Sequence, residues 1–350
     1  MRLALNLGYH VGRGAAANHL ALAREAERLG FDSVWVAEAY GSDAPSALGW
    51  LAGQTSTIGL GSAIMQVPAR TPAMTAMTAA TLDVLSQGRF RLGLGISGPQ
   101  VSEGWHGVRF GQPLARTREY VEVVRLALSR ERVVHEGAHY PLPLPDGPGK
   151  ALRLSLRPIR DQLPIYLAAV GPKNLELAGE IADGWLATFF APDYAAEQLS
   201  AIEAGRIRAG QKLAGFDVAP TVPVAFGDDV EACAAAVRPY AALYVGGMGS
   251  RQQNFYNELA SRMGYRSQAR QVQELYLAGH KLAAAAAVPL QLIDDTSLLG
   301  SPHRVTERLR GFAAAGVTTL AVGLLGRDVK AGLHTLRLLA EAFDRSGTAT

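Results

Sequence analysis

A helix that ends at glycine and is followed at once by a short apolar strand occurs three times in this chain. The three copies read EAERLGFDSVW, EIADGW and FAAAGVTTLAV. Glycine is the residue that most often follows a helix end in the left-handed conformation, and the glycines here are Gly30, Gly184 and Gly316. The stretch PIYLAAVGPKNLELAGEIADGW, residues 164–185, adds a preceding strand and completes a β-α-β unit. Strands joined through a helix run parallel, so the pattern restricts the fold to parallel α/β architectures.

The same template predicts eight strands, most of them short apolar runs typical of parallel strands buried on both faces. The predicted strands are Leu3–Leu7, Ser33–Ala37, Ile58–Ile64, Phe90–Leu94, Ile165–Ala169, Gly184–Thr188, Val218–Val224 and Leu320–Leu324. The predicted helices between them are Ala17–Leu29, Ala44–Gly53, Pro72–Leu85, Ala115–Ser129, Asn174–Ala182, Asp193–Ala209 and Val230–Ala242. Eight such units in 350 residues predict an α/β fold, a (β/α)8 TIM barrel with insertions. A doubly wound open sheet is the alternative, because a sequence does not reveal strand order.

Two stretches interrupt the rhythm and are predicted to be insertions in one barrel domain that spans residues 1–350. The first lies near residues 131–161, around the turn PDGPG, and the second near residues 242–301, which begin with the region of GGMGSRQQNFYNELASRMGY. Both mix aromatic and apolar residues, unlike a low-complexity linker. We therefore expect them to build a lid or a protein interface over one end of the barrel.

Composition excludes several classes of protein. A hydrophobic fraction of 48% with 19% charged residues is that of an ordinary soluble globular protein, and no apolar run reaches the roughly 18–20 residues of a membrane span. The single cysteine, Cys233, excludes an internal disulfide and a cysteine-based metal site. That usage and the absence of a signal-peptide pattern predict a cytoplasmic location. The net charge of +3 is dispersed without a Lys/Arg run, so we expect small molecules and not nucleic acid as partners.

In a barrel of this kind the active site lies at the carboxyl ends of the strands. Strand two ends in EAYG, with Glu38 and Tyr40, strand three in GSAIMQ (residues 61–66) and strand four in GLGISG (residues 93–98). These ends carry many glycines and alanines and few ionisable side chains, which suits a broad flat ligand better than hydrolysis. The chain has no G-x-S-x-G elbow, no H-E-x-x-H and no carboxylates spaced for a metal.

Strand five ends in a glycine-containing turn, residues 169–174, that opens a helix. Free backbone N–H groups and the helix dipole can hold a phosphate at such a place. The alternative is an ordinary tight turn with Gly171 at positive φ and Pro172 at the first helical position.

Three segments together resemble a known family over nearly the whole chain. They are GFDSVWVAE, IGLGSAIMQVPARTPAMTAMTAATLDVLSQGRFRLGLGISG and PIYLAAVGPKNLELAGEIADGW. In this order and spacing they resemble the luciferase-like superfamily of (β/α)8 flavin and deazaflavin oxidoreductases. Within it the chain is most similar to actinobacterial proteins classed as using coenzyme F420.

The resemblance implies where the cofactor binds. Members of that branch hold the deazaflavin ring against a bulge at the end of strand three that contains a non-prolyl cis peptide, and the matching bond is Ala63–Ile64. The resemblance also implies that the loop after strand four and the glycine turn bind the phosphate-bearing tail. The cofactor residues expected on this basis are Ser62, Ala63, Ile64, Gln66, Gly95, Ser97, Gly98, Ala169, Val170, Gly171, Pro172, Lys173 and Asn174.

The chain departs from the family pattern at several positions. Deazaflavin enzymes often carry Asp-His after strand two, where this chain has Glu38-Ala39. Glu38 and Tyr40 are therefore the candidate catalytic residues, although Glu38 could instead pair with an arginine at the barrel mouth. The glutamate of a sugar-phosphate-oxidising group is absent, because Ser97-Gly98 occupies that region. Ile96 stands near the position of an arginine that can bind phosphate in FMN-using luciferases, which favours the deazaflavin.

His106 is either a loop-packing residue or a substrate contact. The function expected from the resemblance is hydride transfer between coenzyme F420 and an unidentified organic molecule. The alternatives are an FMN-dependent luciferase-like monooxygenase and a non-catalytic flavin-binding barrel, which Ala39 in place of histidine leaves open. We also expect a homodimer through the early helices Ala17–Leu29 and Pro72–Leu85, because the second is apolar well beyond one face.

Overall fold

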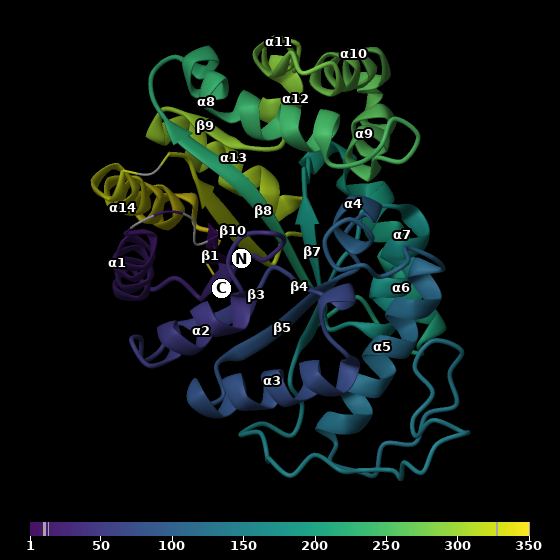
Figure 1. Ribbon diagram of the computed structural model, residues 1–350. Helices are drawn as coiled ribbons and strands as arrows, with labels where there is room; N and C mark the ends of the chain where they lie inside the picture. Colours follow the sequence, from purple (N-terminus) through teal and green to yellow (C-terminus); the bar gives the residue numbers. More distant parts are fainter. Residues whose placement is uncertain (10–11, 13, 327, 350) are drawn as a thin grey trace.

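Eight parallel strands close into a barrel surrounded by helices in the computed structural model, which describes residues 1–9, 12, 14–326 and 328–349 (Figure 1). The barrel strands are β1 (Arg2–Gly8), β2 (Ser33–Val36), β3 (Gly59–Ser62), β5 (Phe90–Gly95), β6 (Ile165–Ala168), β7 (Gly184–Thr188), β8 (Asp217–Phe226) and β10 (Thr319–Leu324). They pair in this order, and the pairing of β10 with both β1 and β8 closes the ring. The TIM-barrel prediction is therefore confirmed, and the open-sheet alternative is wrong.

Two short strands lie outside the predicted set. The predicted third strand breaks after Ser62, and the chain resumes pairing with β5 as β4 (Met65–Gln66). The last residues of β8 run beyond the barrel and pair with β9 (Leu298–Gly300). The second of these pairings continues the barrel sheet outward, toward the helices that follow β8.

Four of the described helices around the barrel begin at polar residues whose side chains cap them. Thr71 accepts a hydrogen bond from the Met74 amide and Pro72 occupies the first helical position, which favours a helix start there. Ser301 caps a later helix in the same way. The helices of this layer are α1 (Ala15–Arg28), α2 (Ala44–Ala52), α3 (Pro72–Leu85), α4 (Pro99–Ser102), α5 (Pro113–Leu128), α6 (Pro172–Ile181), α7 (Ala195–Arg208), α13 (Pro302–Ala314) and α14 (Val329–Ser346).

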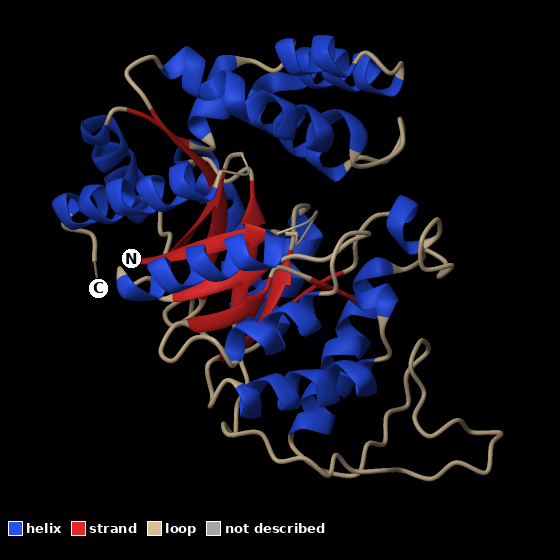
Figure 2. Cartoon of the chain, turned by 60° about the vertical axis from the view of Figure 1, so that its left-hand side comes forward, coloured by secondary structure: helices blue, strands red, loops and turns tan. Residues whose placement is uncertain are grey.

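The two predicted insertions lie at opposite ends of the barrel (Figures 1 and 2). Residues 230–297 form a helical cap, which contains α8 (Val230–Ala242), α9 (Phe255–Ala260), α10 (Arg266–Leu277), α11 (Lys281–Ala286) and α12 (Leu290–Asp295). The cap follows the carboxyl end of β8 and has an apolar cluster of its own. Residues 129–164 precede β6 and extend from the other end, so only the cap can cover a site at the carboxyl ends of the strands.

Two of the three glycines in the repeated junction adopt the expected conformation. Gly30 and Gly316 have φ of 76° and 91° and follow helix ends. The prediction for Gly184 is wrong, because α6 ends at Ile181 with an extended Ala182 as its C-cap, and Gly184 is the first residue of β7. Its missing side chain makes space instead, since a Cβ there would lie 2.4 Å from the ring of Tyr166.

Two aromatic rings fill the barrel interior below its carboxyl end. Trp35 of β2 and Tyr166 of β6 meet edge to face with ring centroids 5.2 Å apart, and both are buried. Gly61 on β3 provides room, because a Cβ there would lie 2.3 Å from the Trp35 ring. The barrel is thus packed at this level, and any ligand space lies above it.

Candidate active site

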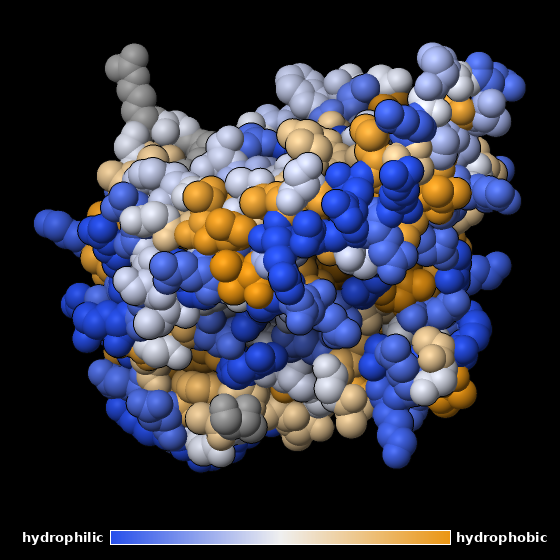
Figure 3. Space-filling view, turned by 90° about the horizontal axis from the view of Figure 1, so that it is seen from below, coloured by the Kyte–Doolittle hydropathy of each residue, from blue (hydrophilic) through white to orange (hydrophobic). Residues whose placement is uncertain are grey.

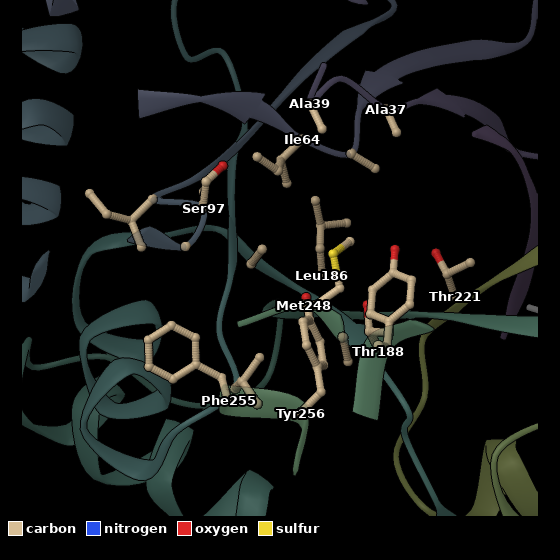
Figure 4. A pocket seen from close by; sticks show the side chains of 18 of the residues that line it. Ala37, Ala39, Ile64, Ser97, Leu186, Thr188, Thr221, Met248, Phe255 and Tyr256 are labelled. Atoms are coloured by element: carbon tan, nitrogen blue, oxygen red, sulfur yellow. The ribbon is translucent and has the colours of Figure 1, made fainter. Parts of the chain in front are cut away.

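A cavity of about 980 Å³ lies at the carboxyl ends of the strands, and its walls contain residues in or shortly after each of the eight barrel strands, together with residues of the cap. Figure 4 shows side chains of the lining, among them Ala39, Ile64 and Ser97 on the barrel side and Met248 and Tyr256 on the cap side. A volume at the upper end of the usual ligand-pocket range of roughly 300–1,000 Å³ has room for a cofactor together with a substrate. This is the place where a barrel of this type carries its active site.

Most of the residues predicted to bind the cofactor line this cavity. Twelve of the thirteen do so, from Ala63 to Asn174, and Ser62 is the exception. Ser62 is fully buried, and its hydroxyl accepts a hydrogen bond from the Gly93 amide and donates one to the Gly93 carbonyl, both at 2.9 Å. The structure therefore gives Ser62 a role in joining β3 to β5, away from the ligand space.

The end of β3 has the geometry that the resemblance implied. The Ala63–Ile64 peptide is cis, which confirms that prediction. The Ala63 amide donates to the Val36 carbonyl at 2.8 Å, so β2 holds the strand up to the break. On the neighbouring strand β5, Gly95 leaves room for the Ile64 side chain, because a Cβ at Gly95 would lie 2.9 Å from Cδ1 of Ile64.

Glu38 is fully engaged by its neighbours. Its carboxylate accepts hydrogen bonds from the Ala44 amide at 3.1 Å, from the Gln66 amide at 2.9 Å and from the guanidinium of Arg70. The side chain is buried, and Arg70 also pairs with Asp43. Of the two alternatives for Glu38, this arrangement favours the ion pair with an arginine at the barrel mouth. Tyr40, the other candidate, lies at the rim and is 61% exposed.

Gln66 links the loop after β5 to the segment that carries His106. Its Nε2 donates to the hydroxyl of Ser97 at 2.7 Å, and its Oε1 lies 3.0 Å from Nε2 of His106. Ser97 has φ of 61°, a left-handed conformation that is uncommon outside glycine and that turns its side chain toward Gln66. His106 itself does not line the cavity. Its position behind Gln66 suits the loop-packing alternative better than direct substrate contact.

The glycine turn after β6 lines the cavity from Ala169 to Asn174. Gly171 has φ of −84°, so the expectation of a positive φ is wrong, while Pro172 does occupy the first helical position. A Cβ at Gly171 would meet nothing within 4 Å. Among the described residues, the amides of Gly171 and Lys173 have no hydrogen-bond partner; Gly171 is the N-cap of α6 and Lys173 lies in its first turn. Such amides at a helix start are suited to an anion.

The cap fixes this turn from behind. Arg262, in the turn between α9 and α10, donates from Nη2 to the Val170 carbonyl at 3.2 Å. The Trp185 indole donates to the Ala169 carbonyl at 2.9 Å from the barrel side. Both bonds fix the carbonyls of the turn to the barrel and to the cap.

Sequence reasoning missed the aromatic part of the lining. Tyr9 follows β1, whereas Tyr240, Tyr244, Phe255 and Tyr256 come from the cap, and all five line the cavity. Burial raises the pKa of the Tyr9, Tyr240 and Tyr244 hydroxyls above the ordinary range and that of Tyr256 to about 12. These phenols are therefore neutral at physiological pH. The only available signal was the aromatic content of the segment after residue 242.

No group of three or more His, Cys, Asp or Glu side chains in the described part of the chain is placed to hold a metal ion. No described helix has both the length and the apolar character to span a bilayer.

Comparisons with known proteins agree with this geometry. The family model described as luciferase-like monooxygenase matches residues 2–319. The chain is 44% identical over 329 residues to a Mycobacterium tuberculosis protein named as a coenzyme F420-dependent oxidoreductase, covering 92% of this chain and 94% of that protein. It is also 29% identical over 313 residues to a 5,10-methylenetetrahydromethanopterin reductase of Archaeoglobus fulgidus, covering 89% and 91% of the two chains.

Solved structures show the same architecture. The coenzyme F420-dependent tetrahydromethanopterin reductase of Methanopyrus kandleri superposes with a TM-score of 0.83 at 26% identity, covering 98% of each chain. An F420-dependent secondary alcohol dehydrogenase shares the fold with a TM-score of 0.78 at 21% identity, covering 97% and 98% of the two chains.

Proposed function

Because the chain belongs to the luciferase-like monooxygenase family, we propose that it is a coenzyme F420-dependent oxidoreductase that exchanges a hydride between the deazaflavin and a small organic molecule. What supports this most directly is that twelve of the thirteen residues expected to hold the cofactor line one cavity. The sequence relative with 44% identity is named for the same cofactor.

The residues of the cavity fit this cofactor. Ala63, Ile64 and Gly95 form one side of the cavity, and Gly95 lets the Ile64 side chain occupy its place there, because a Cβ at Gly95 would collide with it. The amides of Gly171 and Lys173 and the ammonium group of Lys173 suit the phosphate of the tail. Residues 63–66 would therefore back the ring, and residues 171–174 would hold the phosphate.

Coenzyme F420, when bound, supplies the carbon that accepts or gives up the hydride. The protein's contribution is then to orient the two reactants and to keep water away from them. The cap closes over the carboxyl ends of the strands, and apolar and aromatic side chains dominate its side of the cavity. Of the two predicted catalytic residues, Tyr40 is the one placed to meet a substrate, since Arg70 and two amides occupy the Glu38 carboxylate.

The proposal includes a homodimer formed through α2 and α3. Three apolar side chains of α3, Met74, Met77 and Leu85, are 50%, 51% and 55% exposed, and Trp50 of α2 adds to them. The described helix α1, which we expected to take part, has no large apolar side chain that is exposed. A cytoplasmic location and small-molecule partners complete the proposal, in keeping with the single buried, unpaired Cys233.

Cofactor titration tests this function. We expect F420 to quench the tryptophan fluorescence of the purified protein and to raise its melting temperature. F420 should do both at lower ligand concentrations than FMN. Tighter binding of FMN would favour the monooxygenase alternative. Binding of F420 without turnover of any alcohol or carbonyl compound would favour the non-catalytic barrel.

A further inference from the structure

The cavity has two halves that come from different parts of the barrel. The residues assigned to the cofactor follow β3, β5 and β6, which are neighbours in the ring. The opposite half is formed by the ends of β7, β8, β10 and β1, with the cap above them. In Figure 4, Met248 and Tyr256 project into the space that Ile64 borders from the other side. A ligand in the second half would thus face a cofactor in the first.

An aromatic wall lines this second half, and we define it as Tyr9, Tyr240, Tyr244, Phe255 and Tyr256. The rings support one another, since Tyr244 lies 4.6 Å from Tyr240 and 4.8 Å from Tyr256 between ring centroids. Phe189, after β7, packs behind the same three rings at 5.6–6.1 Å. Because barrel and cap both contribute rings, the wall is held in place before any ligand arrives.

Three phenols of the wall, Tyr9, Tyr240 and Tyr244, line the cavity. Burial raises the pKa of each of them, and neighbouring phenols add to the effect. Each phenol therefore keeps its proton at physiological pH and can donate a hydrogen bond. A neutral carbonyl or hydroxyl oxygen is the acceptor that suits such a donor.

The two halves of the cavity differ in the charge of the side chains that line them. Among the described lining residues, the only lysine or arginine is Lys173, which belongs to the glycine turn in the cofactor half. A carboxylate or phosphate placed against the aromatic wall would lose hydration without a described cation to replace it.

We infer that the aromatic wall is the substrate site and that it takes an uncharged, ring-containing carbonyl or hydroxyl compound, whose oxygen accepts a hydrogen bond from the Tyr9–Tyr240–Tyr244 trio. The rings of the wall pack against the ring of the substrate. This inference rests on the proposed function, because it assigns the half of the same cavity that the cofactor leaves open.

The test measures the binding of two matched probes, acetophenone and 4-acetylbenzoate, by calorimetry with and without saturating F420. The probes share the ketone and the ring and differ by one carboxylate. We expect acetophenone to bind at least tenfold more tightly than 4-acetylbenzoate. Tyr244→Phe should weaken acetophenone binding about fivefold to tenfold, as the loss of one hydrogen bond implies. Tyr9→Phe, a change on the barrel and not the cap, should weaken it in the same direction.

Tyr265→Phe is the matched control. It also removes a cap hydroxyl, one that bonds Asp295 and does not line the cavity, so acetophenone affinity should stay unchanged. Equal affinity for the two probes, no binding of acetophenone, or unchanged affinity in both Tyr244→Phe and Tyr9→Phe would overturn the inference. F420 affinity is measured in parallel. If the protein does not bind F420 but binds acetophenone in a tyrosine-dependent way, the proposed function is overturned, while the ligand preference inferred for the aromatic wall is confirmed.

Discussion

Arg70 holds Glu38 at the point where the third barrel strand breaks, with 3.0 Å between Nη2 and Oε2. The same carboxylate accepts a hydrogen bond from the Gln66 amide. The residues just beyond the cis peptide are therefore tied to the segment that follows β2. The pair is nearly dry, since the side chains of Arg70 and Glu38 are 16% and 5% exposed. This ion pair therefore positions the wall against which the cofactor is proposed to lie.

Arg70→Ala should destabilise the protein strongly, because it leaves the buried Glu38 carboxylate without its cation. The expected loss is about 3–5 kcal/mol in the free energy of unfolding, measured by urea denaturation. Arg345→Ala is the matched control, because its pair with Glu341 is 61% and 60% exposed and should contribute at most about 1 kcal/mol. Similar losses in the two variants would contradict the structural role of Arg70.

Gly171→Val should leave the fold intact and weaken cofactor binding. At φ of −84° and with nothing within 4 Å of a new Cβ, valine meets no backbone or steric penalty within the protein. Its methyl groups would still crowd a phosphate at the amides of residues 171–174. We expect a loss on the order of 1–3 kcal/mol in F420 binding, measured by fluorescence titration with circular dichroism as the check on folding.

The control for this variant is Gly311→Val. Gly311 also has open space around a new Cβ, and it lies in α13, outside the cavity lining. F420 affinity should be unchanged there. An unaltered titration in a folded Gly171→Val variant would remove the phosphate assignment.

Gly93→Ala should disrupt the contact between β3 and β5. A Cβ at this position would lie 1.8 Å from the Ser62 carbonyl oxygen, and a backbone atom has little freedom to retreat. The unfolding free energy should fall by about 3 kcal/mol or more. Gly323→Ala on β10 serves for comparison, because its nearest neighbours would be 3.9 Å away. A Gly93→Ala protein as stable as Gly323→Ala would show that β3 and β5 can separate freely.

Stability should depend on pH through Glu25, which joins α1 to α14. Hydrogen bonds from Arg28, with a further one from Arg337, lower its pKa from 4.5 to about 2. Between these values the unfolded chain binds more protons than the folded one, so stability is present above pH 4.5 and declines as the pH falls toward 2. Glu25→Gln should remove about 1–2 kcal/mol of this pH dependence after solvent screening, in thermal melts at pH 5 and pH 3. Glu341→Gln, at an exposed pair, should leave the slope as it is.

Replacing both Met74 and Met77 by lysine should dissociate the proposed homodimer. The two side chains lie on the exposed face of α3, and charged groups there would not tolerate burial against a second copy. Light scattering at micromolar concentration should give a dimer for the wild type and a monomer for the variant. Figure 3 shows the end of the molecule from which residues 129–164 extend, where apolar patches lie among hydrophilic side chains. Leu144→Lys in that segment, where Leu144 is 63% exposed, should leave the dimer intact. A wild type that is monomeric would refute the interface.

The barrel could be predicted from the sequence because its signals are local. Each strand is an apolar run next to a helix with recognisable ends, as Thr71, Pro72 and Gly30 illustrate. The break after Ser62 came only from family resemblance, because GSAIM reads as an uninterrupted strand. The prediction for Gly184 was wrong because, in a sequence, a glycine that makes space for a ring cannot be distinguished from a glycine that follows a helix end.

The site was predictable only in part, because its remaining features are contacts between distant residues. Glu38 and Arg70 are 32 positions apart, and the sequence left the choice between ligand and ion pair open. Tyr9 and Tyr244 meet only because the cap folds back over the end of β1. His106 was a candidate by residue type, yet Gln66 stands between it and the cavity.

The rings of Trp35 and Tyr166 have a kinetic consequence. They fill the barrel interior below the cavity, so a ligand cannot leave through the amino-terminal end of the barrel. Substrate and product would therefore both pass through the end that the cap borders. Under this arrangement, product release becomes a step that can set the rate of turnover.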